Sequence, residues 1–298
     1  MRILNFGSLN IDYVYEVDHF VKPGETLSSL SYSRNTGGKG LNQSVALARA
    51  GAEVYHAGKV GDEGVFLKDY LAESGVHVEH IFVTPVPTGH AFIQVEKTGE
   101  NAIVLYGGAN RAVGSQDIDQ VLYRFEAGDC LLLQNEISSM EELMEKAYRR
   151  GMEIFFNPAP MDEQVLSYPL DKVGWFIVNE LEGSILSGAQ EPEDIPRAFM
   201  AKYPESRLVL TLGSRGAVYA DRNTTIEMPA CRVRAVDTTA AGDTFIGYFL
   251  ASLTGGAEVR SALETAVQAA ALCVTRPGAA DSIPTAAEVA AFLPGRPG

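Results

Sequence analysis

Short apolar runs alternate with helical patterns through the second half of the chain, and this alternation limits the fold more than any other feature. We predict buried strands at residues 130–134, 153–156, 175–178 and 208–211, each followed by a polar or glycine-rich segment and then by a helical pattern. Repeated strand–helix units predict a mostly parallel sheet with helices on both of its faces. The expected fold class is therefore α/β.

Polar or glycine-rich groups stand directly after one predicted strand after another. In chain order they are Asn10 and Asp12 after a strand at residues 2–6, Asn135 with Glu136, Asn157 to Pro160, Asn179 to Glu182, and Gly213 to Gly216. Because open α/β sheets bind ligands at the carboxyl ends of their strands, we expect these groups to form one site. Asn10 and Asp12, taken alone, would also fit an Asx turn.

Two segments do not follow this strand–helix pattern and are predicted to form short β-strands. Residues 13–33 alternate and are interrupted by Pro23-Gly24, and we predict a pair of exposed-edge strands. Residues 89–106 alternate on both sides of a turn at 97–100, which predicts a hairpin that shares a small sheet with the first segment. The predicted domains are an α/β domain of residues 1–12, 34–88 and 107–298, and a β lid of residues 13–33 and 89–106.

The stretch from Val233 to Ala251 carries the strongest chemical signal. An Ala-Ala-Gly turn at residues 240–242 separates a strand end from a helical pattern that has Asp243 in its first turn. Backbone N–H groups at a helix N-terminus favour an anion, and a carboxylate beside them is placed to accept a proton from a hydroxyl. Phosphoryl transfer to an alcohol needs this pair. The alternative is that Asp243 only caps the helix.

A glycine-rich loop, Thr36 to Gln43, opens a second helical pattern at residues 44–50. Glycines let a backbone approach a ligand closely, although a tight strand-to-helix turn has the same composition. The spacing matches neither a Walker A loop nor a dinucleotide-binding fingerprint. The loop is therefore a candidate ligand site without a motif of its own.

Charge and cysteine content exclude several classes of partner. Acidic residues outnumber basic ones by 38 to 24, for a net charge of -14, so we expect neither a nucleic-acid nor a membrane-surface partner. The three cysteines are scattered and make neither a disulfide framework nor a metal motif. We find no signal-peptide pattern or membrane-spanning segment, and we expect a cytoplasmic protein.

Two local signals concern helix and chain ends. Ser138 and Glu141 have the spacing of a capping box for a helix that runs to Gly151. The tail, residues 293–298, is rich in proline and glycine, and we expect it to be frayed.

Taken together, the motifs resemble those of the ribokinase-like carbohydrate kinases. They are Asn10-Ile11-Asp12, Gly37-Gly38-Lys39-Gly40 with Asn42-Gln43, Asn157-Pro158-Ala159-Pro160, Asn179 with Glu182, Thr211 to Gly216, and Asp237 to Phe245. The likeness runs in order from residue 2 to about residue 284, and the Gly-Gly-Lys-Gly and Ala-Ala-Gly-Asp elements are its most specific parts. It implies the ribokinase-like fold with a β lid, which in this family often pairs into a homodimer.

The resemblance also implies an activity and its residues. The expected reaction is ATP-dependent transfer of a phosphoryl group to a sugar's primary hydroxyl, first of all from D-ribose to ribose 5-phosphate. Asp243 would be the base, and the backbone of Ala240, Ala241 and Gly242 would form the anion hole. The sugar would be held by Asn10, Asp12, Gly38, Lys39, Asn42 and Glu136, with Asp12 binding two of its hydroxyls.

For cofactors, the resemblance implies ATP, Mg²⁺ and a monovalent cation such as K⁺. Asn179 and Glu182 would serve the phosphates and, through water, Mg²⁺. The nucleotide-binding site would be lined by Thr211, Gly213, Ser214 and Gly216, with Val267 near the adenine. A cation site next to the anion hole would match Asp237, Thr239, Cys273, Arg276, Gly278 and Ser282, mostly through backbone carbonyls.

Other acceptors and another class of protein stay open. The chain departs from the family pattern at Asn135, where an apolar residue is expected, and at Val267, where a polar or aromatic residue is frequent. Another pentose, a sugar acid, a sugar phosphate or a nucleoside would fit the same fold. Basic residues near the sugar site are few, namely Lys22, Arg34 and Lys39, whereas aromatic residues that could stack on a nucleoside are present in the lid at Tyr13, Tyr15, Tyr32 and Phe92. A non-catalytic sugar-binding protein would be expected to lose Asp243 or the Ala-Ala-Gly turn, and both are present.

Overall fold

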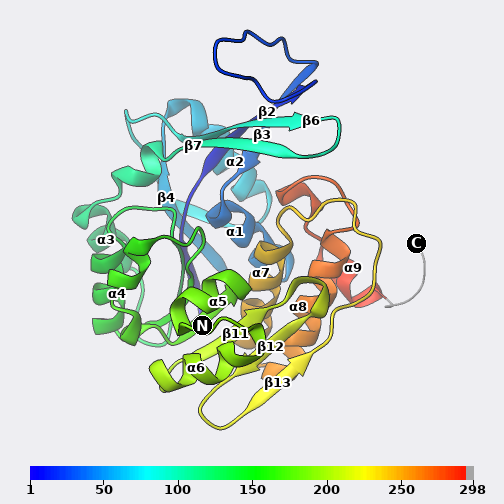
Figure 1. Ribbon diagram of the computed structural model, residues 1–298. Helices are drawn as coiled ribbons and strands as arrows, with labels where there is room; N and C mark the ends of the chain where they lie inside the picture. Colours follow the sequence, from blue (N-terminus) through cyan, green and yellow to red (C-terminus); the bar gives the residue numbers. More distant parts are fainter. Residues whose placement is uncertain (293–298) are drawn as a thin grey trace.

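The computed structural model describes residues 1–292 and contains a large sheet and a small one (Figure 1). From edge to edge the large sheet has β13 (Thr225–Met228), β12 (Ala217–Ala220), β11 (Arg207–Thr211), β10 (Trp175–Asn179), β9 (Glu153–Asn157), β8 (Cys130–Gln134), β1 (Ile3–Phe6), β4 (Val54–Val60) and β5 (His77–Val83). The strands from β5 to β11 are parallel, and β12 and β13 are antiparallel. The predicted α/β fold is confirmed. The predicted fraying of residues 293–298 lies outside the described residues.

Helices cover both faces of the large sheet (Figure 1). One layer holds α1 (Lys39–Arg49), α2 (Val65–Glu73), α7 (Ala241–Thr254), α8 (Val259–Cys273) and α9 (Ala286–Ala291). The other holds α3 (Ser115–Leu122), α4 (Met140–Arg149), α5 (Glu180–Ser187) and α6 (Ile195–Lys202). Successive strand residues face opposite layers, so Leu132 packs in the first core while Leu131 and Leu133 pack in the second. This two-sided burial explains why the central strands are continuous apolar runs.

The small sheet crosses one end of the main domain (Figure 1). Its order is β3 (Ser31–Gly37), β2 (Asn10–Val17), β6 (Gly89–Glu96) and β7 (Asn101–Tyr106). The antiparallel pairing of β6 and β7 confirms the predicted hairpin, and the predicted sharing of one sheet is also confirmed. The division into two domains stays a prediction, and this sheet extends beyond the predicted lid to residues 10–12 and 34–37.

One local prediction about this sheet and one alternative reading of it are wrong. Asn10 and Asp12 lie within β2 and do not form an Asx turn. β2 is also an interior strand, because it lies between β3 and β6, and only β3 and β7 are edges. The parallel pairing of β2 with β6 joins Asn10 to Gly89, a contact that no local pattern contains.

The predicted capping box at Ser138 and Glu141 is wrong as well. α4 begins at Met140, and the residue before it, Ser139, has φ 60° and makes no side-chain cap. The hydroxyls of Ser138 and Ser139 each donate to the carbonyl of Val113 at 2.8 Å. A tertiary carbonyl has replaced the local backbone N–H as the partner of the hydroxyl, so both serines join α4 to the segment before α3.

α1 and α7 cross so closely that one of them needs a glycine at the contact. A Cβ at Gly247 would overlap the side chain of Ala46 and the α1 backbone beside it. Both helices begin at the edge of the sheet where the parallel strands end. The close crossing therefore brings their first turns together at that edge.

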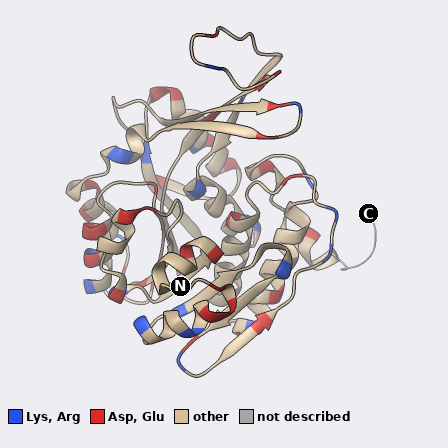
Figure 2. Cartoon of the chain, in the orientation of Figure 1, with Lys and Arg blue, Asp and Glu red and all other residues tan. Residues whose placement is uncertain are grey.

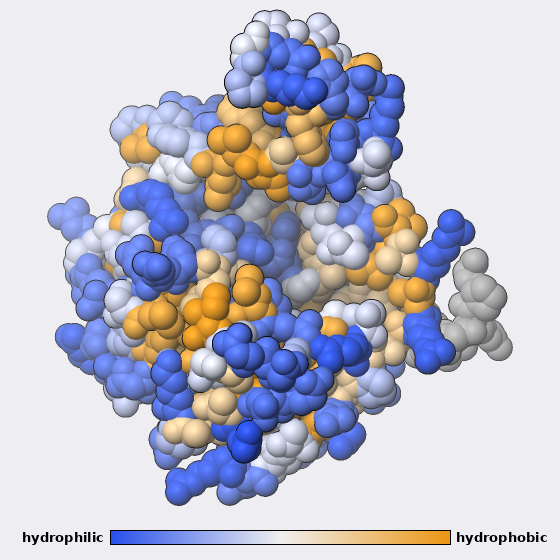
Figure 3. Space-filling model, viewed as in Figure 1, coloured by the Kyte–Doolittle hydropathy of each residue, from blue (hydrophilic) through white to orange (hydrophobic). Residues whose placement is uncertain are grey.

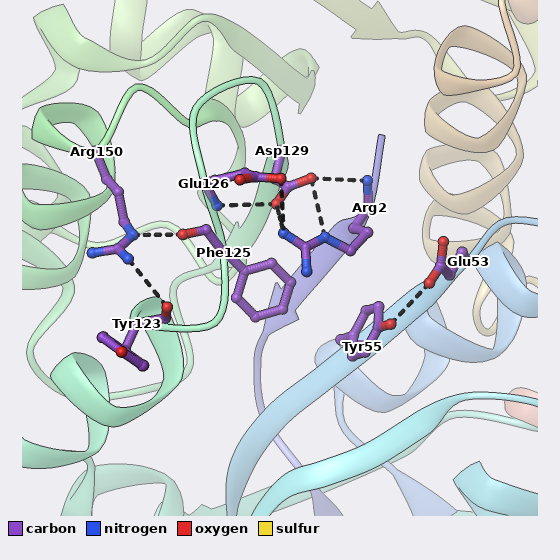
Figure 4. A network of polar contacts seen from close by, with 8 residues as sticks. All are labelled: Arg2, Glu53, Tyr55, Tyr123, Phe125, Glu126, Asp129 and Arg150. Carbon is purple, nitrogen blue, oxygen red and sulfur yellow. Dashed lines mark hydrogen bonds and ion pairs between the residues drawn. The ribbon is translucent and has the colours of Figure 1, made fainter.

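At the opposite, amino edge of the sheet, Asp129 joins the starts of β1 and β8 (Figure 4). Its Oδ1 accepts from the Arg2 backbone N at 3.1 Å, and its Oδ2 accepts from Arg2 Nη2 at 2.5 Å and Glu126 N at 3.1 Å. The Arg2 guanidinium also lies 5.2 Å from the ring centre of Phe125. Burial raises the pKa of Asp129, but the hydrogen bonds from Arg2 and Glu126 outweigh it, and the net pKa is below the usual value.

We expect Asp129→Asn to lower the free energy of unfolding at neutral pH by about 2 kcal/mol, because the partly buried N–H groups of Arg2 and Glu126 lose a charged acceptor. Since the folded pKa is depressed, this stabilisation is present above the unfolded value of about 4 and is lost as the pH falls through the folded value. The deficit of the variant should therefore shrink below about pH 4. Urea denaturation of both proteins from neutral pH to below pH 4 measures the difference in their unfolding free energies.

Glu126→Gln is the matched control. The Glu126 carboxylate lies 3.7 Å from Arg2 Nη2, but its side chain is 82% exposed. We expect it to change the unfolding free energy by less than about 0.5 kcal/mol. Equal effects of the two substitutions would contradict the assigned role of Asp129.

Candidate active site

Asp243 lies in the first turn of α7 with its carboxylate against α1. Its Oδ2 accepts from Asn42 Nδ2 at 3.1 Å and its Oδ1 from Gln43 Nε2 at 2.9 Å. The side chain is 8% exposed. The residue that precedes the helix is Ala240, and within residues 1–292 the Asp243 carboxylate bonds to Asn42 and Gln43 and to no N–H at the start of α7, so the capping alternative is wrong.

A pocket of about 210 Å³ opens beside Asp243 at the carboxyl edge of the sheet. The predicted residues in its wall are Lys39, Asn179, Glu182, Thr211, Ala240, Gly242 and Asp243. They come from α1, the ends of β10 and β11, the first turn of α5, and the start of α7. Figure 3 shows the surface hollowed between the small sheet and the main domain, with apolar residues of the small sheet overhanging the hollow.

The turn before α7 has an unusual backbone at Ala240, where φ is 59° and ψ is 7°. This left-handed conformation costs a non-glycine residue about 1–2 kcal/mol. The N–H of Ala241 donates to Thr238 O at 3.3 Å, and the N–H of Gly242 has no backbone acceptor within residues 1–292. The turn therefore presents the positive end of α7 to the pocket, an environment that favours an anion.

Lys39 is a partly buried cation among three acids. The charge of Asp243, followed by those of Glu136 and Glu182, raises the pKa of Lys39 against the opposing effect of burial. The Lys39 backbone N donates to Glu136 Oε2 at 3.0 Å, and the Ser8 hydroxyl donates to the same oxygen. Burial in turn raises the pKa of Glu136. Lys39 is thus held charged at the pocket wall.

The predicted sugar-binding residues meet on the lid side of this pocket. Asn10 Oδ1 accepts from Asn110 Nδ2 at 2.8 Å, and Asn110 also bonds to the Leu9 backbone. Burial, reinforced by the charge of Glu136, raises the pKa of Asp12 to about 6, so these two acids lie near each other. Gly38, at the start of α1, has φ 96°, a conformation that favours glycine. Because Asn42 contacts Asp243, the base and the sugar-binding set belong to one site.

The register of the small sheet separates the aromatic residues from this site. Asp12 pairs with Asn35 and Ala91 across the sheet and shares their face. Tyr13 and Phe92, which pair with each other, lie on the opposite face with Tyr15 and Tyr32. The rings named above as possible nucleoside-stacking groups therefore point away from Asp12.

Asn179 and Glu182 form a capping box at the start of α5, a structural role that we did not predict. Asn179 Oδ1 accepts from Glu182 N at 2.9 Å, while Glu182 Oε2 accepts from Asn179 N at 2.9 Å. Glu182 is 5% exposed, and burial raises its pKa. Across residues 1–292 there is no cluster of three or more His, Cys, Asp or Glu side chains suited to a metal.

The predicted cation-site residues lie in two loops that Asp237 joins. Its Oδ1 accepts from Thr239 N at 2.8 Å and its Oδ2 from Gly278 N at 2.9 Å. Cys273 Sγ lies 3.8 Å from Thr239 O and 3.1 Å from Ser282 Oγ. The sixth residue, Arg276, directs its guanidinium to Glu288 at 2.6 Å. The loops before α7 and after α8 are therefore linked next to the Ala240 turn.

Four predicted nucleotide-site residues do not line this pocket. Gly213, Ser214 and Gly216 lie in the turn between β11 and β12, where Gly213 and Ser214 are exposed and Gly216 is buried. Val267 is 6% exposed and packs in the core on the sheet-facing side of α8. The roles given to these four residues stay predictions.

Sequence reasoning missed three buried amides behind the pocket, namely Asn5, Asn110 and Gln134. Asn157 stood in a recognised motif, and it lines the pocket. Gln43 stood in a recognised motif but received no role, and isolated Asn or Gln residues form no pattern that marks them. The departure at Asn135 has a structural explanation. Its Nδ2 donates to Pro160 O at 2.8 Å and its Oδ1 accepts from the Tyr168 hydroxyl at 2.8 Å.

The chain is similar to known proteins along nearly its whole length. The model of the family described as "pfkB family carbohydrate kinase" matches residues 2–286. A ribokinase from Haemophilus influenzae is 37% identical over 297 residues, covering 96% of this chain and 96% of that protein. The structure of a Cryptococcus neoformans ribokinase in complex with ADP has a TM-score of 0.86 and 33% identity, covering 98% and 99% of the two chains. An Arabidopsis thaliana ribokinase complexed with ribose and ATP has a TM-score of 0.85 and 28% identity, covering 97% of each.

The raised pKa of Asp12 leads to a testable pH dependence of stability. Because the folded pKa of about 6 lies above the unfolded value, Asp12 stabilises the fold at low pH, and this contribution is lost as the pH rises through 6. An asparagine at position 12 does not titrate. From pH 5 to pH 7 we expect the wild type to lose about 1 kcal/mol of unfolding free energy relative to Asp12→Asn. Denaturation curves of both proteins at the two pH values measure this, and parallel behaviour would show that Asp12 titrates as an exposed acid.

Proposed function

The chain belongs to the pfkB family of carbohydrate kinases, and we propose that it transfers the γ-phosphoryl group of ATP to the primary hydroxyl of D-ribose, giving ribose 5-phosphate. The observation that carries this proposal is the buried Asp243 carboxylate beside the open N-terminus of α7 in a single pocket. The similarity to ribokinases, including one complexed with ribose and ATP, supports ribose as the acceptor.

In this proposal Asp243 accepts the proton of the sugar hydroxyl as that oxygen attacks the phosphorus. Each carboxylate oxygen can accept more than one hydrogen bond, so the contacts with Asn42 and Gln43 leave room for the hydroxyl. The N–H groups of Ala240 to Gly242 and the charge of Lys39 stabilise the negative charge on the transferred group. The small sheet would exclude water, which competes with the sugar as acceptor.

The sugar would lie between the small sheet and α1. Asp12 binds two of its hydroxyls, and Asn10, Gly38, Lys39, Asn42 and Glu136 complete the site. Asn42 Oδ1 supports this placement, because it is buried and has no hydrogen-bond partner among residues 1–292. A buried acceptor without a donor costs free energy, and a sugar hydroxyl would supply the donor.

The nucleotide would occupy the wall formed by Asn179, Glu182 and Thr211, and would extend to Gly213, Ser214 and Gly216, with Val267 toward the adenine. Mg²⁺ fits this wall because the ion keeps several waters and needs few protein ligands, and Glu182 offers one buried carboxylate there. When bound, Mg²⁺ would neutralise phosphate charge. Asn179 and Glu182 would orient its water shell.

A monovalent cation such as K⁺ fits the two loops joined by Asp237. The Asp237 carboxylate supplies negative charge, and hydrogen bonds from Thr239 and Gly278 depress its pKa below the usual value despite burial. The guanidinium of Arg276 is neutralised by Glu288, so it does not oppose a second cation. Backbone carbonyls of the set Asp237, Thr239, Cys273, Arg276, Gly278 and Ser282 would hold the ion, whose chemical contribution would be to order the turn before α7.

The small sheet also supports a homodimer. Its outer face carries Tyr13, Tyr15, Tyr32 and Phe92, whose neighbouring rings have centroids 5.2 to 6.4 Å apart. Tyr32 is 54% and Phe92 45% exposed. Contiguous exposed aromatic surface marks interaction sites, and a second copy of this sheet is the partner that we propose.

We also propose a cytoplasmic location. Cys130, Cys231 and Cys273 are free thiols, which persist in reducing compartments where ATP is available. Separately, none of the helices described in residues 1–292 has the length and apolar character to cross a membrane. Figure 2 shows acidic and basic residues intermixed on the face in view.

The function is tested by incubating the protein with ATP, Mg²⁺ and single acceptors, and by measuring coupled ADP release. The panel contains D-ribose, 2-deoxyribose, other pentoses, a sugar acid, a sugar phosphate and a nucleoside. We expect D-ribose to give the highest kcat/KM, and phosphate to appear on its primary hydroxyl. A higher kcat/KM with another acceptor would overturn the assignment of ribose as the substrate. ADP release without any phosphorylated acceptor would overturn the proposed kinase reaction itself.

Asp243→Asn should lower kcat by about 100- to 10,000-fold while leaving sugar binding largely intact, because the substitution removes the base and keeps the side-chain shape. Steady-state kinetics and calorimetric titration with the sugar separate the two effects. A variant that turned over at the wild-type rate would exclude Asp243 as the base.

Activity should be higher in K⁺ than in buffers that contain only Na⁺. The expected effect lies in kcat, because the site adjoins the anion hole and not the sugar. Asp237→Ala should abolish the difference between the two salts, and the exposed Asp171→Ala, outside this site, serves as the control. Equal rates in both salts for the wild type would contradict a functional cation site.

A further inference from the structure

A chain of buried amide side chains leads from Asp243 into the core, and the roles proposed above do not use it. It runs from Asp243 to Gln43, then to Gln134 and to Asn5, with a branch from Gln43 to Asn157. Gln43, Gln134 and Asn5 have no exposed surface. Burying amides is costly unless their hydrogen bonds are made, so a run of them behind a base points to a contribution beyond packing.

Gln43 is the member of this chain that touches the base. Its Nε2 lies 2.9 Å from Asp243 Oδ1 and 3.3 Å from Asn157 Oδ1. Unlike Asn157, Gln43 does not line the pocket. Gln43 can therefore affect a reaction in the pocket only through the groups that it holds, above all Asp243.

A backbone carbonyl fixes the direction of the hydrogen bonds at the far end of the chain. Asn5 Nδ2 donates to the carbonyl of Gly40 at 2.8 Å, and a carbonyl can only accept. Asn5 Oδ1 is therefore the acceptor for Gln134 Nε2 at 3.0 Å. The same Nε2 donates to Gln43 Oε1 at 2.6 Å, which leaves the Gln43 amide nitrogen facing Asp243.

The branch from Gln43 to Asn157 independently gives the same direction for the hydrogen bonds of the Gln43 amide. Asn157 Nδ2 donates to the carbonyl of Ile177 at 3.0 Å, so its Oδ1 must accept from Gln43 Nε2. Amide orientations are ordinarily inferred from such networks. Here the carbonyls of Gly40 and Ile177 each require the same orientation of the Gln43 amide. Gln43 therefore offers Asp243 a donor and cannot accept a proton from it.

We propose that Gln43 is a positioning residue for the base: its fixed N–H donor hydrogen-bonds to the Asp243 carboxylate and holds it in one orientation toward the pocket. A donor stabilises the charged form of a buried acid, which burial alone would disfavour. The close crossing of α1 and α7 makes the contact short, because it lies one turn from the point where Gly247 meets Ala46. This inference rests on the proposed phosphoryl transfer, since it needs Asp243 to act as the base.

The test is the kinetics of Gln43→Met, which keeps the volume and removes the donor. We expect kcat to fall by about 10- to 100-fold, the sugar KM to change by less than about threefold, and the acid limb of the kcat–pH profile to move up by about one unit. The movement of the acid limb is the readout that a purely structural defect would not produce.

Ser44→Ala is the matched control on the same helix. Ser44 is equally buried, accepts from Asn5 Nδ2 at 2.8 Å and bonds to His56 Nδ1 at 2.8 Å, but has no hydrogen bond to Asp243. It should lower the melting temperature and leave kcat and its pH profile unchanged. If Gln43→Met reduced kcat no more than this control, or left the acid limb in place, the proposal would be overturned.

Gln134→Met provides a second route if Gln43→Met does not fold. It removes the donor to Gln43 Oε1, one of the two contacts that fix the Gln43 amide, whereas Asn157 Oδ1 still accepts from Gln43 Nε2, so the donor to Asp243 is held less firmly. A smaller fall in kcat with the same upward movement of the acid limb supports the proposal, whereas wild-type kinetics overturn it. Wild-type turnover in the same assay tests the proposed function separately: its absence overturns both ideas, and its presence with unaffected variants overturns only the role of Gln43.

Discussion

The hydrogen bonds between α1 and the Asp243 carboxylate depend on how closely α1 and α7 cross. Gly247 allows the contact with Ala46, and one turn away Asn42 and Gln43 reach both oxygens of Asp243. A larger residue at 247 would separate the helices and leave a buried acid without donors. Packing of small residues thus decides the electrostatics of the site, because N–H···O hydrogen bonds form only when donor and acceptor approach to about 2.7–3.2 Å.

Charge balance is the second constraint on the pocket. Lys39 is set among Asp243, Glu136 and Glu182, and each acid supports its positive charge. A buried cation without these partners would tend to lose its proton. The phosphates of a nucleotide would bring further negative charge to this wall. The N-terminus of α7, presented by the left-handed turn at Ala240, offers a partial positive charge that does not titrate.

Particular residues show where sequence reasoning succeeded and failed. The hairpin at 89–106 and the parallel sheet were predictable, because each strand carries its own periodic pattern. The interior position of β2 was not, since it depends on pairing with β6 far along the chain. Ser138 met a tertiary acceptor instead of Glu141, and Asn179 with Glu182 formed the capping box that was expected elsewhere. Gln43 stood in a recognised motif, yet its bond to Asp243 exists only after two helices have packed.

The sequence by itself determined the fold class, the family and the residue types available for chemistry, because these follow from local periodicity and from motifs that are contiguous in the chain. Tertiary structure alone decided which face of the small sheet carries Asp12 and which the aromatic rings, and which amides point at Asp243. These depend on strand register and helix crossing. A register shift of one residue would move side chains to the other face of the sheet, and a shift of a few ångströms at the helix crossing would break the contacts with Asp243. No local pattern encodes the register or the crossing distance.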